Sequence, residues 1–573
     1  MSDSLPEAQE SEVKDKFNAE EYAYLKNSGF TSEIFKIEIQ NMPKFYGYAE
    51  VKKLMDFFSI NFNKIKIPWR NSKYCFVCFR NEEDRQNAIE KINHLKWKGN
   101  LLKAFTSKPV QDPLVRKRKQ EENEKNSNKI QAKKPKTVAE SSEPLGNLPY
   151  EEQLAFKQRN IDQVLEQFKV ELRNTNTSQG KVNMQLYADP VIKVKPIISS
   201  PQLVGYRNKC EFSIGRNSNN ELQVGNRVGN YVSGSLFVEA PDELKMPPEK
   251  MKLTAKIFRN FVQQSSLDVY NHLTYKGHFR QLTIRLHDDD KALMIIVGIH
   301  PQQMTEEEKS KFQAELVLFF TEGEGMCLEV SSIYYEEIQK LQTGQQERVM
   351  KHLYGDTHVH DYIQGFKFQI SPSSFFQGNT KGAEKLYEEI IDLASLSPKT
   401  IVLDVCCGTG TIGLCMAKFC KEVHGMEIIP QAIEDAKKNA EINDIKNAHF
   451  SAGSADNLIQ SMVKQVKLES DEEMVAVVDP PRAGLSTKAI MQLRNSTKIK
   501  KLIYVSCSPA QVVKNFVNLC KNSTKVMRGE PFVAKIARAV DMFPHTVHCE
   551  LVVLFERKSK NETELAGDDE AKE

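Results

Sequence analysis

Two segments in the C-terminal third of the chain carry side chains suited to covalent chemistry. Cys507 lies in the run Val505-Ser506-Cys507-Ser508-Pro509, after an apolar strand pattern and before a helical one. Asp479 closes another apolar strand pattern in the run Val478-Asp479-Pro480-Pro481-Arg482. Because the carboxyl ends of parallel strands meet at one edge of a sheet, both side chains are expected at the same crevice. A helix N-terminus is expected to lower the pKa of Cys507 below the free value of ~8.5, which favours a thiolate nucleophile.

A third candidate is Glu550, in the run His545-Thr546-Val547-His548-Cys549-Glu550-Leu551. The apolar strand pattern that follows could bring its carboxyl group to the same crevice, where partial burial is expected to raise its pKa. A carboxylate of raised pKa is suited to removing a proton near neutral pH. The alternative is an exposed glutamate on an edge strand, and sequence spacing alone leaves the choice open.

A glycine loop upstream predicts a cofactor site. The apolar run 401–405 leads into Cys406-Cys407-Gly408-Thr409-Gly410 and then into a helical pattern near Thr411. The two glycines let a ligand approach the backbone, and Glu427 closes the next strand pattern, where a carboxylate can accept from a ribose diol. A dinucleotide loop would have a third glycine. With Asp404 before the loop, the pattern favours S-adenosyl-L-methionine.

The residue after the two prolines restricts the methyl acceptor. Methylases of exocyclic amines commonly have an aromatic residue there to stack the base, whereas this chain has Arg482. Carbon 5 of uracil, by contrast, accepts a methyl group only after a nucleophile adds to carbon 6, and a thiolate such as that of Cys507 suits this task. Methylation at a ring carbon is therefore the favoured reaction.

The elements around these residues predict a chain of several domains. After residue 380, strand and helix patterns alternate regularly, which predicts an α/β doubly wound parallel sheet, and the last two strand patterns could form a hairpin. The predicted organisation is a disordered N-terminus (1–30), an α+β RNA recognition motif (31–108), a charged linker (109–148), a long helix and connector (149–199), a β-rich α+β RNA-binding domain (200–370), a methyltransferase domain (371–558) and a disordered tail (559–573).

The first of these domains is interpreted as RNA-binding from its aromatic central strand. Tyr74 and Phe76 are placed to stack on bases, although they could equally fill a core, and Glu38 stands where such modules usually have a second stacking aromatic residue. In the β-rich domain, the run Tyr206-Arg207-Asn208-Lys209 and Arg280 could contact RNA phosphates or be solvated surface charges.

Composition bounds the remaining possibilities. The net charge of +3 does not identify a nucleic-acid partner, and no apolar run reaches the ~20 residues that cross a bilayer, so no membrane partner is expected. The N-terminus lacks a secretory pattern, which predicts a cytoplasmic protein, and two basic clusters in the linker add the nucleus as an alternative. Eleven cysteines lack zinc-site spacing, so no metal is expected.

The motifs DVCCGTGTIG, DPPRAGL, YVSCSP and FPHTVHCE resemble those of the RNA 5-methyluridine methyltransferase family over residues 200–558. This resemblance implies that Cys507 is the nucleophile and Glu550 the proton acceptor. It also implies that Gln377, Glu427 and Asp479 contact the cofactor or the pocket around it. The implied substrate is RNA, with the uridine at position 54 of tRNA as the target and other structured RNA as an alternative.

Two rival functions remain at this point. Methylation of cytidine carbon 5 would also use a cysteine, but such enzymes typically carry a second functional cysteine directly after a proline of the fourth-strand motif, where this chain has Arg482. A non-catalytic RNA-binding or tRNA-folding protein is the other rival, which the intact Cys507 and Glu550 disfavour. The sequence does not indicate an oligomeric state.

Overall fold

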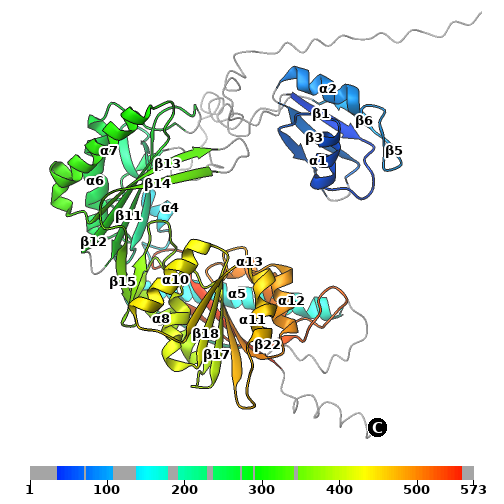
Figure 1. Cartoon of the computed structure of the whole chain (residues 1–573), viewed down its shortest axis with the longest axis vertical. Coiled ribbons are helices and arrows are strands. Elements are labelled where there is room, and N and C mark those ends of the chain that lie inside the picture. The colour runs from blue at the N-terminus through cyan, green and yellow to red at the C-terminus, as the bar shows by residue number, and fades with distance from the viewer. Residues whose placement is uncertain are drawn as a thin grey trace, which may run out of the picture.

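The computed structural model describes residues 35–69, 72–79, 81–107, 137–177, 192–228, 237–271, 274–287, 291–340 and 346–557. These residues form three large sheets, of four, seven and eight strands, and two short hairpins (Figure 1). The segments predicted to be disordered, 1–30 and 559–573, and most of the predicted charged linker lie outside the described residues. The sheets define an N-terminal, a central and a C-terminal region.

The N-terminal domain has the order strand, helix, strand, strand, helix, strand expected from the sequence. Its sheet order is β2-β3-β1-β6, with β1 in the middle paired antiparallel to both β3 and β6. One face is covered by α1 and α2 around a core that includes Val51, Leu54 and Ile92, whereas no helix within the described ranges covers the other face (Figure 1). The elements are β1 (Phe35–Gln40), α1 (Tyr48–Phe57), β2 (Lys64–Lys66), β3 (Tyr74–Phe79), α2 (Glu82–Ile92), β4 (Lys96–Trp97), β5 (Asn100–Leu101) and β6 (Lys103–Thr106).

The central region, called the central domain below, contains a seven-stranded sheet and two long helices. Its sheet order is β10-β9-β8-β11-β12-β13-β14, and α6 and α7 pack on one face around a cluster that includes Phe258, Phe261 and Phe312. The elements are β8 (Lys209–Arg216), β9 (Leu222–Arg227), β10 (Val238–Glu239), α6 (Glu249–Gln264), β11 (Phe279–His287), β12 (Ala292–Ile299), α7 (Glu306–Thr321), η4 (Glu324–Leu328), β13 (Ser332–Lys340) and β14 (Gln346–Gly355). The hairpin of β15 (Val359–Ile363) and β16 (Phe366–Ile370) connects this domain to the eight-stranded sheet of the C-terminal region.

The C-terminal region contains the predicted parallel sheet, extended by strands of mixed direction. Strands β19, β18, β17, β20 and β21 lie side by side and parallel, and the predicted terminal hairpin follows as β23 and β22. The elements are α8 (Thr380–Ala394), β17 (Thr400–Val405), α9 (Thr411–Met416), η5 (Ala417–Phe419), β18 (Glu422–Glu427), α10 (Pro430–Ile442), β19 (Ala448–Ala452), α11 (Ala455–Gln465), β20 (Glu473–Val478), α12 (Thr487–Asn495), β21 (Ile499–Ser506), α13 (Pro509–Cys520), β22 (Phe532–Val540) and β23 (Glu550–Arg557).

This sheet is buried on both faces, which explains its nearly continuous apolar strands. Ile401 and Leu403 belong to a core cluster shared with α11, α12 and α13, whereas Val402 belongs to a second cluster shared with α8, α9 and α10. Successive side chains of a strand point to opposite faces, so each strand feeds both clusters. The architecture is therefore the mixed α/β fold of a doubly wound sheet, with helices on both sides.

The segment before the central domain packs with the eight-stranded sheet of the C-terminal region. The sequence did not indicate this arrangement. Helix α5 (Tyr150–Thr177) forms as predicted and packs against α13 through Phe168 and Phe516. Strand β7 (Lys193–Ile198), within the range predicted as a connector, pairs in parallel with β22 at the sheet edge. A short helix, α4 (Val138–Ser142), lies in the range predicted as a charged linker. Among the described residues, none of the helices has the length and apolar character needed to cross a bilayer.

Candidate active site

The candidate nucleophile and base lie at the same end of two neighbouring strands. Strands β21 and β23 pair antiparallel, with Ser506 opposite Leu551. Continuing this register by one residue brings Cys507, which follows β21, opposite Glu550, which opens β23. Asp479 follows β20, the other neighbour of β21. The sheet therefore gathers the three predicted side chains at one edge, although they are far apart in the sequence.

The environment of Cys507 differs from the expected one. Its side chain is half-buried, at the start of the loop before α13. Burial raises the pKa of the Cys507 thiol, and the carboxyl groups of Glu550 and Asp479 raise it further, while Arg482 lowers it. The prediction of a lowered pKa is therefore wrong, because burial and two nearby acids outweigh the effects that stabilise the thiolate.

The acids of the site have the raised pKa expected of buried carboxyl groups. Glu550 is 4% exposed, and burial together with the charge of Asp479 raises its pKa well above the ordinary range, with Arg482 opposing the shift. Burial also raises the pKa of Asp479 to about 6. The predicted shift of Glu550 is thus confirmed, and its cause is burial first and the second acid next.

Arg482 is a site residue whose role the sequence analysis missed. Its side chain is exposed at the rim, and its positive charge lowers the pKa of both Cys507 and Glu550. Arg482 is thus the cation that opposes the effect of burial and of the two acids on Cys507. The sequence contained the signal, a cation directly after the paired prolines, but Arg482 served there only as an argument against methylation of an amine and of cytidine carbon 5.

The glycine loop has the backbone conformation expected of a ligand cradle. Gly408 and Gly410 have φ of 54° and 80°, in the left-handed region that favours glycine. Nothing lies within 4 Å of the position that a Cβ at Gly408 would occupy, so the space beside it is open. Glu427 lies across this space, where its carboxylate accepts from the Gly408 amide at 3.3 Å and the Ile429 amide at 3.0 Å.

A second carboxyl group lies beneath this loop. The side chain of Asp404, the fifth residue of β17, is fully buried and accepts a hydrogen bond from the Gly413 amide of α9 at 3.0 Å. Its other oxygen has no hydrogen-bond partner in the part of the chain that the structure describes. Burial raises the pKa of Asp404 to about 7, with Asp479 and Glu427 contributing. Three acids around one open glycine turn favour a ligand that carries positive charge.

Gln377 lies in the segment 371–379 between β16 and α8. The central domain holds this segment against the eight-stranded sheet. The side chain of Gln377 is buried, and the backbone carbonyl oxygen of this residue accepts from the Asn208 side chain at 2.8 Å. Asn208 also donates to Thr380, whose hydroxyl group donates to Asp361. The segment is thus fixed from both domains. No hydrogen bond of the Gln377 side-chain amide is resolved, so its predicted contact with the cofactor or pocket remains a prediction.

The predicted phosphate contacts of the central domain are partly corrected. Tyr206 and Asn208 are buried, and the Tyr206 hydroxyl group donates to the Pro544 carbonyl at 3.0 Å, so these two side chains are structural. Arg280 lies over the Tyr270 ring and donates to the Ile338 carbonyl. Lys209 is paired with Glu211 at 2.7 Å. In the described part of the chain, no His, Cys, Asp and Glu side chains are grouped in threes as a metal site requires.

The chain is similar to several known methyltransferases. The model of the family described as tRNA (uracil-5-)-methyltransferase matches residues 327–558. The human tRNA (uracil-5-)-methyltransferase homolog A is 38% identical over 94% of this chain and 85% of its own length. The mouse tRNA (uracil-5-)-methyltransferase homolog B is 37% identical over 73% of this chain and 85% of its own length. A Pyrococcus abyssi tRNA (uracil-54, C5)-methyltransferase, solved in complex with S-adenosyl-L-homocysteine, aligns with a TM-score of 0.49 and 21% identity over 74% of this chain and 87% of that chain.

The sequence identity of 38% to the human relative, over 94% of this chain, shows to which family the chain belongs. The chain belongs to the tRNA (uracil-5-)-methyltransferase family. It is accordingly an enzyme, and its cofactor is S-adenosyl-L-methionine. The open turn at Gly408 and the acids Asp404, Glu427 and Asp479 fit this cofactor, because its sulfonium is a cation and its ribose needs an acceptor.

Proposed function

We propose that this enzyme methylates carbon 5 of the uridine at position 54 of tRNA through a covalent adduct between Cys507 and carbon 6 of the uracil ring. The observation that carries the proposal is the register of β21 and β23, which brings Cys507 opposite Glu550. Carbons 5 and 6 are adjacent ring atoms, so a nucleophile and a base held on neighbouring strands can reach both. The position in tRNA rests on the sequence resemblance described above.

Cofactor binding is assigned to the glycine turn and the acids around it. Glu427 would hold the ribose hydroxyl groups, Gly408 would let the ligand lie against the backbone, and Gln377 and Asp479 would line the pocket toward the base. When bound, S-adenosyl-L-methionine supplies an electrophilic methyl group. The closeness of Asp479 to both Asp404 and Glu550 supports a pocket in which cofactor and base meet.

The first step uses the thiolate of Cys507. The thiol proton passes to water, which reaches the half-buried side chain, and the sulfur then adds to carbon 6 of uracil. The electron pair of the ring double bond moves toward the carbonyl oxygen at carbon 4 and makes carbon 5 nucleophilic. Arg482 supports this step because its charge favours the thiolate over the thiol. The uridine must be extruded from the folded RNA to reach the sulfur.

The last step uses the carboxylate of Glu550. After methyl transfer, carbon 5 carries both a methyl group and a proton, and the ring cannot recover its double bond until that proton leaves. Glu550 takes the proton, the electron pair restores the double bond, and the bond between carbon 6 and sulfur breaks to release the thiolate. Burial raises the pKa of Glu550, which makes it a stronger base than an ordinary carboxylate.

The test uses tRNA that carries 5-fluorouridine, because fluorine at carbon 5 cannot be removed as a proton. With the cofactor present, the wild-type enzyme is expected to form an adduct that survives denaturing electrophoresis, whereas Cys507→Ser forms none.

Mass spectrometry of nucleosides from ordinary tRNA treated with labelled cofactor should find the label in 5-methyluridine. Replacing the uridine at position 54 with cytidine should abolish labelling, while label in 5-methylcytidine would favour the rival enzyme, and no label a non-catalytic RNA-binding protein.

A second proposal concerns the N-terminal domain, whose helix-free sheet face we propose to bind single-stranded RNA as an RNA recognition motif does. Tyr74 and Phe76 of β3 are partly exposed on this face, and Phe105 of β6 is 46% exposed. Lys36 lies over the Phe76 ring at 5.0 Å from its centroid. Glu38 lies between Phe76 and Phe105, so the face presents aromatic rings on both sides of one acid.

The stacking residues can be tested in the full chain. Phe76→Ala with Phe105→Ala is expected to weaken tRNA binding roughly tenfold or more, because stacking contributes ~1–3 kcal/mol per base. Phe57→Ala is the matched control, since Phe57 is 81% exposed on α1 and not on the sheet face. Equal affinity of the double variant and the control would reject base stacking by this domain.

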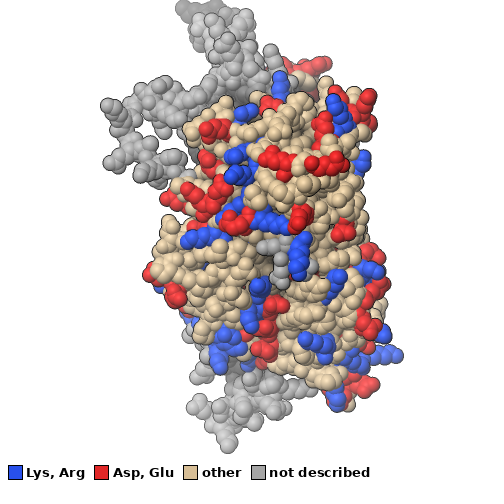
Figure 2. Space-filling model, turned by 90° about the vertical axis from the view of Figure 1, so that its left-hand side faces the viewer, with Lys and Arg blue, Asp and Glu red and all other residues tan. Residues whose placement is uncertain are grey.

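We also propose that the central domain contributes phosphate contacts through Arg207 and Lys209. Arg207 forms an isolated β-bridge with Asn379, at the edge of the candidate site. Figure 2 shows Lys and Arg side chains along the middle of one face of the molecule, interspersed with Asp and Glu. Reversing both charges should weaken tRNA binding and reduce its dependence on salt. Normal affinity across a salt titration would reject these contacts.

A further inference from the structure

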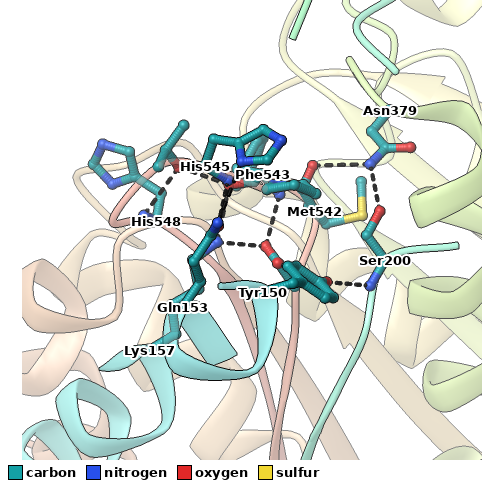
Figure 3. A network of polar contacts seen from close by, with 12 residues as sticks. Tyr150, Gln153, Lys157, Ser200, Asn379, Met542, Phe543, His545 and His548 are labelled. Carbon is teal, nitrogen blue, oxygen red and sulfur yellow. Dashed lines mark hydrogen bonds and ion pairs between the residues drawn. The ribbon is translucent and has the colours of Figure 1, made fainter. Parts of the chain in front are cut away.

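Helix α5 holds the loop that leads to Glu550, which comprises residues 541–549 between β22 and β23 and is called the β22–β23 loop below. Lys157 of α5 donates to the Asp541 carboxylate at 2.6 Å and to the Phe543 carbonyl at 2.9 Å (Figure 3). Neither the Lys157 nor the Asp541 side chain is exposed to solvent. One lysine therefore fixes two points of the loop at its start.

Two further side chains of α5 contact the same loop. The Tyr150 hydroxyl group donates to the other oxygen of Asp541 at 2.9 Å and accepts from the Ser200 amide at 2.8 Å. Gln153 accepts from the His545 amide at 2.8 Å, and its side-chain nitrogen lies 3.3 Å from His545 Nδ1. His545 has φ of 69°, a left-handed backbone conformation that residues other than glycine rarely adopt. Gln153 thus holds the loop where its backbone is least favourable.

The buried pair at the start of the loop leaves it little freedom to move. Asp541 accepts from Lys157, from Tyr150 and from the Phe543 amide, so a shift of its carboxylate would break several buried bonds at once. An uncompensated buried charge is strongly unfavourable, which ties the pair together. Residues 541–549 span the distance between this anchor and Glu550, which is also paired with Val540 across the hairpin.

We propose that Lys157 is a positioning residue for Glu550, acting with Tyr150 and Gln153 through the β22–β23 loop. Lys157 touches neither the substrate nor the cofactor in this proposal. It fixes the loop so that the Glu550 carboxylate meets carbon 5 of the base bound to Cys507. The inference rests on the proposed function, because it requires that Glu550 remove the carbon 5 proton after the adduct has formed.

The reaction has two halves, formation of the covalent adduct and removal of the carbon 5 proton. The proposal predicts a defect in the second half only. Cys507 is carried by β21 and α13, which α5 does not hold through these bonds, so formation of the adduct should be preserved when Lys157 is replaced. Removal of the proton should be slowed, since small displacements of a catalytic group cost large factors in rate. A general loss of folding would instead lower both halves together.

The experiment compares wild type with Lys157→Met in the full chain. With tRNA carrying 5-fluorouridine, the variant should form the covalent adduct at a rate within about twofold of wild type, a small difference on the scale of catalytic effects. With ordinary tRNA and cofactor, its turnover should fall roughly tenfold or more and the adduct should accumulate on a denaturing gel. Lys169→Met is the matched control, because Lys169 lies on the same helix in a surface pair with Glu166 at 3.6 Å.

Each outcome separates the two proposals. If wild type forms no adduct with 5-fluorouridine tRNA, the covalent mechanism itself is rejected. If wild type does and Lys157→Met turns over ordinary tRNA at the normal rate, or loses both halves equally while remaining folded, the positioning role is rejected. Should Lys157→Met not fold, Gln153→Ala serves as the second variant. It removes both contacts with His545 and the hydrogen bond to the Leu148 carbonyl but leaves the pair of Lys157 and Asp541 intact, and the same accumulation of adduct is expected from it.

Discussion

Asn515 of α13 and Leu485 are joined by two hydrogen bonds in opposite directions. The Leu485 amide donates to the Asn515 side-chain oxygen at 2.7 Å, and the Asn515 nitrogen donates to the Leu485 carbonyl at 3.2 Å. The Tyr504 hydroxyl group donates to the same oxygen at 2.7 Å. One buried amide therefore couples the loop that carries Arg482 to the strand and helix on either side of Cys507.

Replacing Asn515 with Leu is expected to lower the free energy of unfolding by roughly 3 kcal/mol, because each buried group left without a partner costs ~1–3 kcal/mol. Urea denaturation of the full chain measures the change. Lys514→Ala is the control, since Lys514 is exposed on the same helix. A loss no larger than that of the control would mean that the three bonds contribute little.

Arg482→Gln is expected to shift the pH dependence of methylation toward higher pH. Arg482 lowers the pKa of both Cys507 and Glu550, and the proposed mechanism uses both groups in their ionised forms. Without this charge both pKa values rise, so a higher pH is needed to reach the same activity. Single-turnover rates between pH 6 and 9 would measure the shift. Arg528→Gln, on an exposed loop, should leave the profile in place, and an unmoved profile in Arg482→Gln would contradict the assigned electrostatics.

Glu427→Gln is expected to weaken cofactor binding roughly tenfold or more, because a hydrogen bond to a charged group contributes ~1.5–3 kcal/mol. Calorimetric titration with S-adenosyl-L-homocysteine measures the dissociation constant without requiring turnover. Glu434→Gln serves as the control, since Glu434 forms a surface pair with Lys437 on α10. Equal affinity of the two variants would remove Glu427 from the cofactor site.

Asp404 makes the cofactor-free protein less stable as the pH rises. Its pKa in the folded protein is about 7, raised above the ordinary 3.8, so the folded state binds the proton more tightly than the unfolded state does. The resulting stabilisation is complete below pH ~4 and is lost as the pH rises through ~7, a change of at most roughly 4 kcal/mol.

Asp404→Asn cannot ionise, so its melting temperature should fall less than that of wild type between pH 5 and 8. Calorimetry of both proteins without cofactor measures this difference. The asparagine oxygen can still accept from the Gly413 amide, which keeps the local hydrogen bond. Parallel curves for the two proteins would show that Asp404 carries its charge throughout this range.

The sequence predicted what short-range patterns determine. The strand, glycine turn and helix around Gly408 are contiguous, and the expected strand ends bring Cys507 and Asp479 to one edge because parallel strands have a common direction. Glu550 was harder to place, since its strand runs antiparallel and its role came from the resemblance. The raised pKa of Glu550 followed from expected burial alone.

Contacts between distant segments could not be predicted in this way. Lys157 and Asp541 are 384 residues apart, and neither stands in a local pattern that indicates a partner. The pKa of Cys507 was predicted in the wrong direction because burial of the thiol raises it first, and the two acids that raise it further come from other strands. Tyr206 and Asn208 were assigned to the surface because polar residues usually lie there, whereas both are buried at the contact between domains.

The pairing of β21 with β23 also determines which changes of sequence the reaction can tolerate. Strands in a sheet lie ~4.8 Å apart, so the hydrogen-bond ladder of β21 and β23 keeps the backbone segments that carry Cys507 and Glu550 next to each other. Residues added to surface turns elsewhere leave the pairing of β21 with β23 unchanged. A slip of one residue in the pairing would instead turn Glu550 to the opposite face of the sheet, and the enzyme could then capture its substrate without ever releasing it.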